Sequence, residues 1–227
     1  MRGLMYASGV PTRHPTAISD SGIIVGDTHS SDYQASPGPF EPFKPKPDPS
    51  YIHATSDGKD LGTLGGPNSH AAAVNNFGLV AGSSDTVSGA SHAFLFMPVD
   101  LAHPTEGKMV DVGTLPGMTA GAALGLNDKG RVVGWSSVGD LKSAFLLSDG
   151  IMEDLNDRLP ATLGIHLDQA TAINDAGQIV AYGHGADGVE HGYLLSATPT
   201  PEPSVLALLA MAGAGLGVRR AWISKKV

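Results

Sequence analysis

The chain has 227 residues, 41% of them hydrophobic and 16% charged, a composition typical of one large or two small globular domains. Its 30 glycines and 16 prolines indicate many turns and few long helices, which favours an all-β fold. The absence of cysteine excludes disulfides and cysteine nucleophiles, and the 21 acidic against 10 basic residues within 1–198 argue against a nucleic-acid-binding protein.

The N-terminal segment contains no apolar run long enough for a signal peptide. In residues 1–10 the apolar side chains are scattered, and Pro11 follows them. Because later features of the chain indicate export, we expect the sequence to be truncated, so that its natural N-terminus lies before Met1. The alternative is a cytosolic protein with an apolar tail.

One segment recurs four times, at residues 17–26, 73–82, 125–134 and 172–181. Each copy has an apolar strand end, a turn rich in Asn and Asp, a glycine and a β-branched strand, which together predict a hairpin. The glycine accepts the positive φ that ends the turn. The central glycines Gly22, Gly78, Gly130 and Gly177 are 56, 52 and 47 residues apart, a period that suits a four-stranded, propeller-type blade.

Two further motifs supply a third and a fourth strand. About 14 residues after the hairpin glycine stand the triplets His92-Ala93-Phe94, Ser143-Ala144-Phe145 and His191-Gly192-Tyr193, whose rings would fill the core between blades. The turns Ser56-Asp57-Gly58 and Ser148-Asp149-Gly150 predict a second hairpin. The fourth strand leads into the strings Asp-Leu-Gly-Thr-Leu-Gly-Gly from Asp60, Asp-Val-Gly-Thr-Leu-Pro-Gly from Asp111 and a variant from Asp154.

These triplets, strings and hairpins resemble the HAF repeat of bacterial extracellular proteins, over roughly residues 17–196. The resemblance implies a propeller-like array of about four four-stranded antiparallel repeats in an extracellular protein. Four repeats are few for a closed propeller, which has about 4 to 8 blades, and this agrees with a truncated N-terminus. The proline-rich stretch 37–49 interrupts the first repeat and is predicted to be a surface loop.

No motif in the chain predicts a catalytic, cofactor-binding or metal site. The nine histidines lack metal-ligand spacing, and His92 and His191 are expected to bond to neighbouring backbone at the start of a strand. The recurrence of Asp60, Asp111 and Asp154 indicates an architectural role. The Asn-Asp-x-Gly turns are explained by turn formation, with calcium binding as a residual alternative.

The C-terminal segment combines an extended linker, an apolar run and a basic cluster. Residues 204–218 carry no charge, and a helix over 204–223 approaches the length that spans a bilayer. The cluster Arg219, Arg220, Lys225 and Lys226 places the C-terminus in the cytoplasm and the preceding residues outside, by the positive-inside rule. The alternative is a buried helix packed on the body of the protein.

Pro201, Glu202 and Pro203 stand directly before this apolar run. The order of this tripeptide, the apolar run and the basic cluster resembles the PEP-CTERM sorting signal of Gram-negative bacteria, which an exosortase recognises and cuts. The resemblance covers residues 201–227 and implies that Pro201, Glu202 and Pro203 are recognition residues and that Arg219 and Arg220 form the stop signal.

The sequence therefore predicts a β-repeat domain over residues 1–198 and a sorting tail over 199–227. Its predicted role is that of a non-catalytic, exported surface or extracellular-matrix protein, transiently anchored in the inner membrane by one helix and processed by an exosortase-type enzyme. The first alternative is a glycan-binding module of the exopolysaccharide matrix, in which Trp135 and exposed tyrosines stack on sugars. The second is a secreted hydrolase with an unrecognised site.

Overall fold

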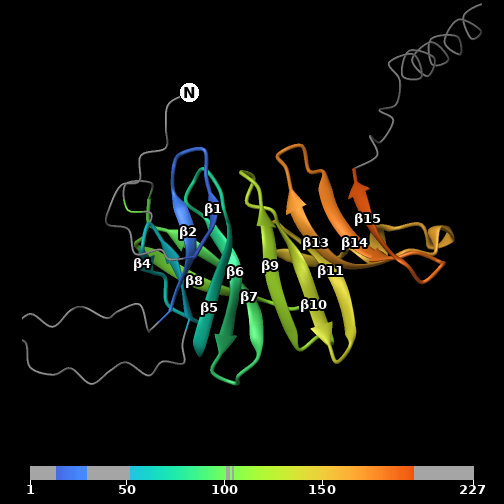
Figure 1. Cartoon of the computed structure of the whole chain (residues 1–227), viewed down its shortest axis with the longest axis horizontal. Helices are drawn as coiled ribbons and strands as arrows, with labels where there is room; N and C mark the ends of the chain where they lie inside the picture. Colours follow the sequence, from blue (N-terminus) through green and yellow to red (C-terminus); the bar gives the residue numbers. More distant parts are fainter. Residues whose placement is uncertain (1–13, 30–51, 101–102, 104, 197–227) are drawn as a thin grey trace, which may run out of the picture. The chain divides into compact units, whose positions relative to one another are not determined.

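The computed structural model describes residues 14–29, 52–100, 103 and 105–196, which form an all-β structure, as predicted (Figure 1). Two short 3-10 turns, η2 (Leu155–Arg158) and η3 (Ala161–Leu163), precede the last three strands. The strands are β1 His14–Ile18, β2 Ile24–His29, β3 Ile52–Ser56, β4 Lys59–Asp60, β5 Gly65–Val74, β6 Val80–Thr86, β7 Ser91–Pro98, β8 Gly107–Gly113, β9 Ala120–Leu126, β10 Val132–Val138, β11 Leu141–Ser148, β12 Ile151–Asp154, β13 His166–Ile173, β14 Ile179–His184 and β15 Glu190–Leu195.

Each sequence repeat folds into one antiparallel sheet whose strands are paired in chain order. The sheets are β1-β2-β3-β4, β5-β6-β7-β8, β9-β10-β11-β12 and β13-β14-β15, so the fourth sheet contains three described strands. Every neighbouring pair is antiparallel. The sheets contact one another in the order of the chain, in a propeller-like arrangement.

Both predicted turns are present in the described residues. The glycines that end the first hairpin turns have positive φ values of 90° at Gly22, 75° at Gly78, 72° at Gly130 and 80° at Gly177. The second turns place Asp57 and Asp149 in the left-handed region as well, each followed by a glycine with positive φ. Asp tolerates this region better than most residues do, and Asp57 Oδ1 also accepts from Ile24 N of the neighbouring strand at 3.0 Å.

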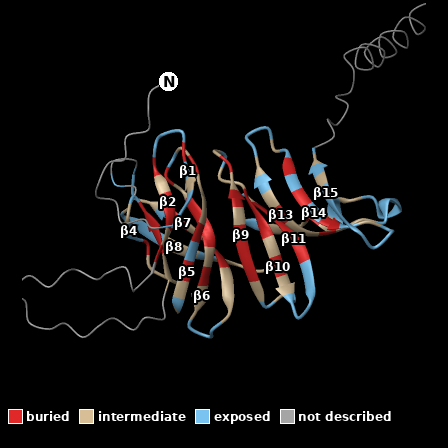
Figure 2. Ribbon diagram, in the orientation of Figure 1, coloured by how far each residue is buried: buried red, intermediate tan, exposed pale blue. Residues whose placement is uncertain are grey.

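The hydrophobic core is divided among the three gaps between consecutive sheets. One cluster joins the first two sheets through Val25 and Phe94, a second joins the next pair through Ala81 and Phe145, and a third joins the last pair. Figure 2 shows these buried positions recurring along the inner strands. Phe94 and Phe145 are fully buried, which confirms for these two repeats that the aromatic ring of the third strand fills the core, whereas Tyr193 is half-buried against the last cluster. Each ring contributes about 1.5–3 kcal/mol by leaving water.

The strings that begin at Asp60, Asp111 and Asp154 connect one sheet to the next. In the first two, the backbone N–H of the leucine at the fifth position of the string donates to a buried serine of the following sheet. Leu64 N donates to Ser84 Oγ at 2.8 Å, and Leu115 N donates to Ser136 Oγ at 3.0 Å. In the third, Asn156 bonds to both backbone groups of Leu167 at the start of the last sheet. The connection is thus anchored by side chains at each crossing.

Several predicted features lie outside the described residues. They are the proline-rich stretch 37–49, the boundary at 198–199 and the apolar helix over 204–223. Within the described part of the chain, no helix has the length and apolarity needed to cross a membrane.

Candidate functional site: the asparagine ladder

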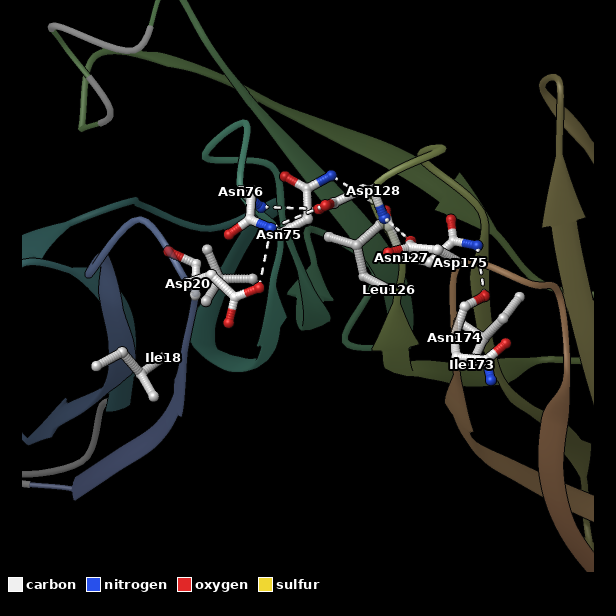
Figure 3. Close-up of a pocket in the computed structure, with 12 residues that line it drawn as sticks. Ile18, Asp20, Asn75, Asn76, Leu126, Asn127, Asp128, Ile173, Asn174 and Asp175 are labelled. Carbon is white, nitrogen blue, oxygen red and sulfur yellow. Dashed lines mark hydrogen bonds between the residues drawn. The ribbon is translucent and has the colours of Figure 1, made fainter.

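The first hairpin turns of all four repeats meet around one shallow hollow of about 210 Å³. Figure 3 shows the turn residues of successive repeats following one another along it, joined by hydrogen bonds. Each repeat contributes an apolar strand end and two polar turn residues. The lining residues are Ile18, Ser19, Asp20, Val74, Asn75, Asn76, Leu126, Asn127, Asp128, Ile173, Asn174 and Asp175.

The side chain of the first polar turn residue forms hydrogen bonds within its own hairpin and to the hairpin of the next repeat. Asn127 Oδ1 accepts from the backbone N–H groups of Lys129 and Arg131 at 3.1 and 3.0 Å, which closes the turn. Its Nδ2 donates to the carbonyl of Asn174 in the next repeat at 3.0 Å. Asn75 repeats the arrangement and donates to the carbonyl of Asn127 at 3.1 Å. Both asparagines are buried, so these bonds satisfy groups that water does not reach.

The second polar turn residue forms a parallel line of hydrogen bonds. Asn76 N donates to Asp128 Oδ1 at 3.0 Å, and Asp128 N donates to Asp175 Oδ1 at 2.9 Å. Asn76 Nδ2 donates to Asp128 Oδ2 at 2.8 Å, so both oxygens of this carboxylate accept from one neighbouring residue. We call the two lines together the asparagine ladder. Its carboxylates are engaged with amide donors, and the described residues contain no group of three or more acidic or histidine side chains that could hold a metal ion.

The histidine of the third-strand triplet pairs with the aspartate of the connecting string. His53 Nδ1 donates to Asp60 Oδ2 at 2.6 Å, and His92 Nδ1 donates to Asp111 Oδ2 at 2.9 Å. The other oxygen of each aspartate accepts from a glycine N–H two residues on, at 2.7 and 2.8 Å. The partner predicted for His92 and His191 was neighbouring backbone. Their partner is instead a carboxylate, which is Asp111 for His92 and Asp187, at 3.1 Å, for His191.

The triplet of the first repeat was missed in the sequence. His53-Ala54-Thr55 occupies the same place in the first sheet as His92-Ala93-Phe94 in the second. Thr55 lacks the ring that marks the motif, and residues 30–51 separate the triplet from its hairpin. The signal that identifies it is the Ser56-Asp57-Gly58 turn directly after it.

A different His–Asp pair joins the first sheet to the second. Asp27 accepts from His70 Nδ1 at 3.0 Å and from Ala71 N at 3.1 Å, so one carboxylate of β2 holds two groups of β5. The hydrogen bond to Asp27 raises the pKa of His70 above 6.5; burial opposes this shift, while the charges of Asp27 and Asp85 add to it. The protonated histidine therefore stabilises the contact between the two sheets.

We expect the stability contributed by His70 to depend on pH. Because its pKa is higher in the folded than in the unfolded protein, the contribution is complete below about pH 6 and is lost as the pH rises through the folded pKa. Thermal unfolding of His70→Gln should therefore differ most from the natural protein in acid, and the difference should shrink as the pH rises through the folded pKa. His103→Gln, which removes an exposed pair with Asp100 within one connection, is the matched control. Equal pH profiles for His70→Gln and His103→Gln would contradict the assignment.

A larger hollow of about 420 Å³ lies at the end of the third sheet. Its floor is formed by Leu115, Met118 and Met152, which belong to the core between the second and third sheets. On its rim, Arg158 pairs with Glu153. These groups stabilise the sheet end, and we assign them no chemical role.

Trp135, proposed from the sequence to stack on sugars, is half-buried in β10. The ammonium of Lys142 lies 4.9 Å from the centre of its ring, which occupies one of the two faces a sugar would use. The predicted sorting residues Pro201, Glu202, Pro203, Arg219 and Arg220 lie outside the described residues.

No protein-family model, curated protein or solved structure matches this chain. The resemblances to the HAF repeat and to the PEP-CTERM signal stay predictions.

Proposed function

We propose that this chain is a non-catalytic, exported repeat protein of the bacterial surface or extracellular matrix, delivered by an exosortase-type system. The proposal is supported mainly by one observation: the recurring polar residues form hydrogen bonds to other groups of the protein. Asn75, Asn127 and Asp128 join repeats to one another, and the aspartates of the connecting strings bind turn N–H groups and histidines. Residues engaged in this way support a scaffold role.

Export and sorting rest on the C-terminal sequence. Pro201-Glu202-Pro203, the uncharged run 204–218 and the basic residues after it follow one another in the order that a sorting tail requires. The acidic excess of residues 1–198 suits a soluble domain outside the cell. The glycan-binding alternative is weaker, because Lys142 covers one face of Trp135.

The proposal is tested by fractionating cells that express the gene with its upstream DNA and measuring the mass of the product. We expect a surface or secreted product that ends near Pro203. Replacing Pro201, Glu202 and Pro203 by alanine should leave the tail uncut, whereas Pro199→Ala, four residues before Pro203, should be processed normally. A cytosolic product that retains Val227 would overturn the proposal of export.

A further inference from the structure

Each of the first three sheets buries one face against the sheet that follows it. The central position of this face lies three residues after the hairpin glycine, at Val25, Ala81 and Val133, and all three side chains have 0% exposure. The cross-strand partners at this position are Ser56, Leu95 and Leu146. The interface between repeats is therefore the same structural element used three times.

The fourth sheet presents the corresponding face to solvent. Val180 stands three residues after Gly177 and pairs with Leu194, and these side chains are 43% and 66% exposed. Ala172 and Tyr182 are exposed beside them. Figure 2 shows buried and exposed positions mixed along β14, and β15 largely exposed. We call Ala172, Val180, Tyr182 and Leu194 the terminal face.

The asparagine ladder ends at the same place. Asn75 Nδ2 and Asn127 Nδ2 each donate to a carbonyl of the following repeat. Asn174 Nδ2 instead donates to Gln178 Oε1 in its own turn, at 2.8 Å. The amide group that would continue the ladder is therefore present, but it bonds within its own repeat.

The first sheet carries the complementary surface. Val74, Leu126 and Ile173 occupy equivalent positions at the ends of β5, β9 and β13, and each packs against the core cluster shared with the preceding sheet. Ile18 holds this position in β1 and is 67% exposed. Beside it, Ser19 holds the position whose backbone carbonyl accepts from the preceding repeat at Asn127 and Asn174, in the third and fourth repeats.

We propose that the first sheet of a second copy of this chain docks on the terminal face and continues the stack of repeats head to tail. The docking partner is a second copy of this chain because, at each of the three junctions within the chain, the equivalent face is covered by the next repeat. The contact joins different surfaces of the two copies, so it is heterologous and builds either closed rings or open filaments. The inference rests on the repeat interfaces and does not depend on export or sorting.

The test uses two variants of the full chain that each block one of the two surfaces. Leu194→Asp places a charge on the terminal face, and Ile18→Asp places one on the first sheet. Sedimentation velocity in mild detergent at about 0.15 M salt, where charge repulsion is largely screened, should show concentration-dependent oligomers for the natural chain and monomers for each variant alone. A mixture of the two variants should form a heterodimer, because one retains the terminal face and the other the first sheet.

The matched control is Val87→Asp, a charge at an 85% exposed apolar residue in the β6–β7 turn, which should assemble like the natural chain. Circular dichroism verifies that all three variants are folded. A natural chain that stays monomeric, or oligomers that survive Leu194→Asp, would overturn the proposal. The second result would assign association to another surface, such as the apolar tail.

Cross-linking distinguishes docking between copies from closure within one copy. The chain contains no cysteine, so Ile18→Cys together with Leu194→Cys provides two defined thiols. A short bismaleimide should produce a ladder of multimers on a denaturing gel. A cross-link within the monomer would show that the first and fourth sheets of one chain close on each other, and would overturn the proposal.

Discussion

Gly134→Ala is expected to destabilise the protein by about 3 kcal/mol, the upper end of the cost of overpacking. A Cβ atom at Gly134 would lie 2.0 Å from the carbonyl oxygen of Ala122 and 2.9 Å from the ring of Phe145. The first neighbour is backbone of the adjacent strand β9, which pairs with β10 next to a shift in register. The second is a fully buried core ring. Neither neighbour can move without breaking strand pairing or core packing.

Urea denaturation of the full chain measures this loss as a change in the free energy of unfolding. Gly192→Ala is the matched control, because a Cβ there has no neighbour within 4 Å and the equivalent residues Ala93 and Ala144 are already alanine. Its stability should match that of the natural protein within about 0.5 kcal/mol. Equal losses in the two variants would show that the close approach at Gly134 is not the cause.

The same glycine shows how far sequence reasoning reaches. The recurring hairpin ends in Gly26, Gly82 and Gly134 but in Ala181, and the sequence gives no reason for the exception. In the fourth sheet the close approach falls two residues later, where a Cβ at Gly183 would lie 1.9 Å from the carbonyl oxygen of His166. Gly183 pairs with Leu167, which lies beside a register shift between Leu167 and Gln169.

Local chemistry accounts for what was predicted correctly. Positive φ at the hairpin glycines, the Asp-Gly turns and the buried rings of Phe94 and Phe145 each depend on a few neighbouring residues, so their sequence pattern is sufficient. The repeats are also similar enough for one correct hairpin to predict the others.

Bonds between repeats could not be predicted in this way. The residues joined by the asparagine ladder are 47 or 52 positions apart, and an asparagine in a turn is fully explained by its own hairpin. The pairing of His92 with Asp111 was also missed, since the sequence shows both motifs but not which oxygen faces which nitrogen. The pairing of His53 with Asp60 was missed together with its triplet.

Asn127→Asp is expected to lower the free energy of unfolding by about 2–3 kcal/mol at pH 7, because it leaves buried groups unsatisfied. The new carboxylate still accepts from the N–H groups of Lys129 and Arg131, so the turn is kept. It cannot donate to the carbonyl of Asn174, which the natural amide reaches at 3.0 Å, and it sets a buried negative charge against that oxygen. The loss therefore arises at the contact between repeats, from the lost donor and from the buried charge together.

Asn174→Asp provides the comparison, because Asn174 is exposed and its amide donates to Gln178 within one turn. That substitution should change stability by less than about 1 kcal/mol, whereas Asn127→Ala, which also removes both turn bonds, should cost more than Asn127→Asp. Urea denaturation of the three variants orders these contributions. The deficit of Asn127→Asp should also shrink in acid, since a protonated carboxyl group donates to the carbonyl that the amide contacted. If Asn127→Asp and Asn174→Asp were equally stable, the ladder would follow from the packing of the repeats and would not hold them together.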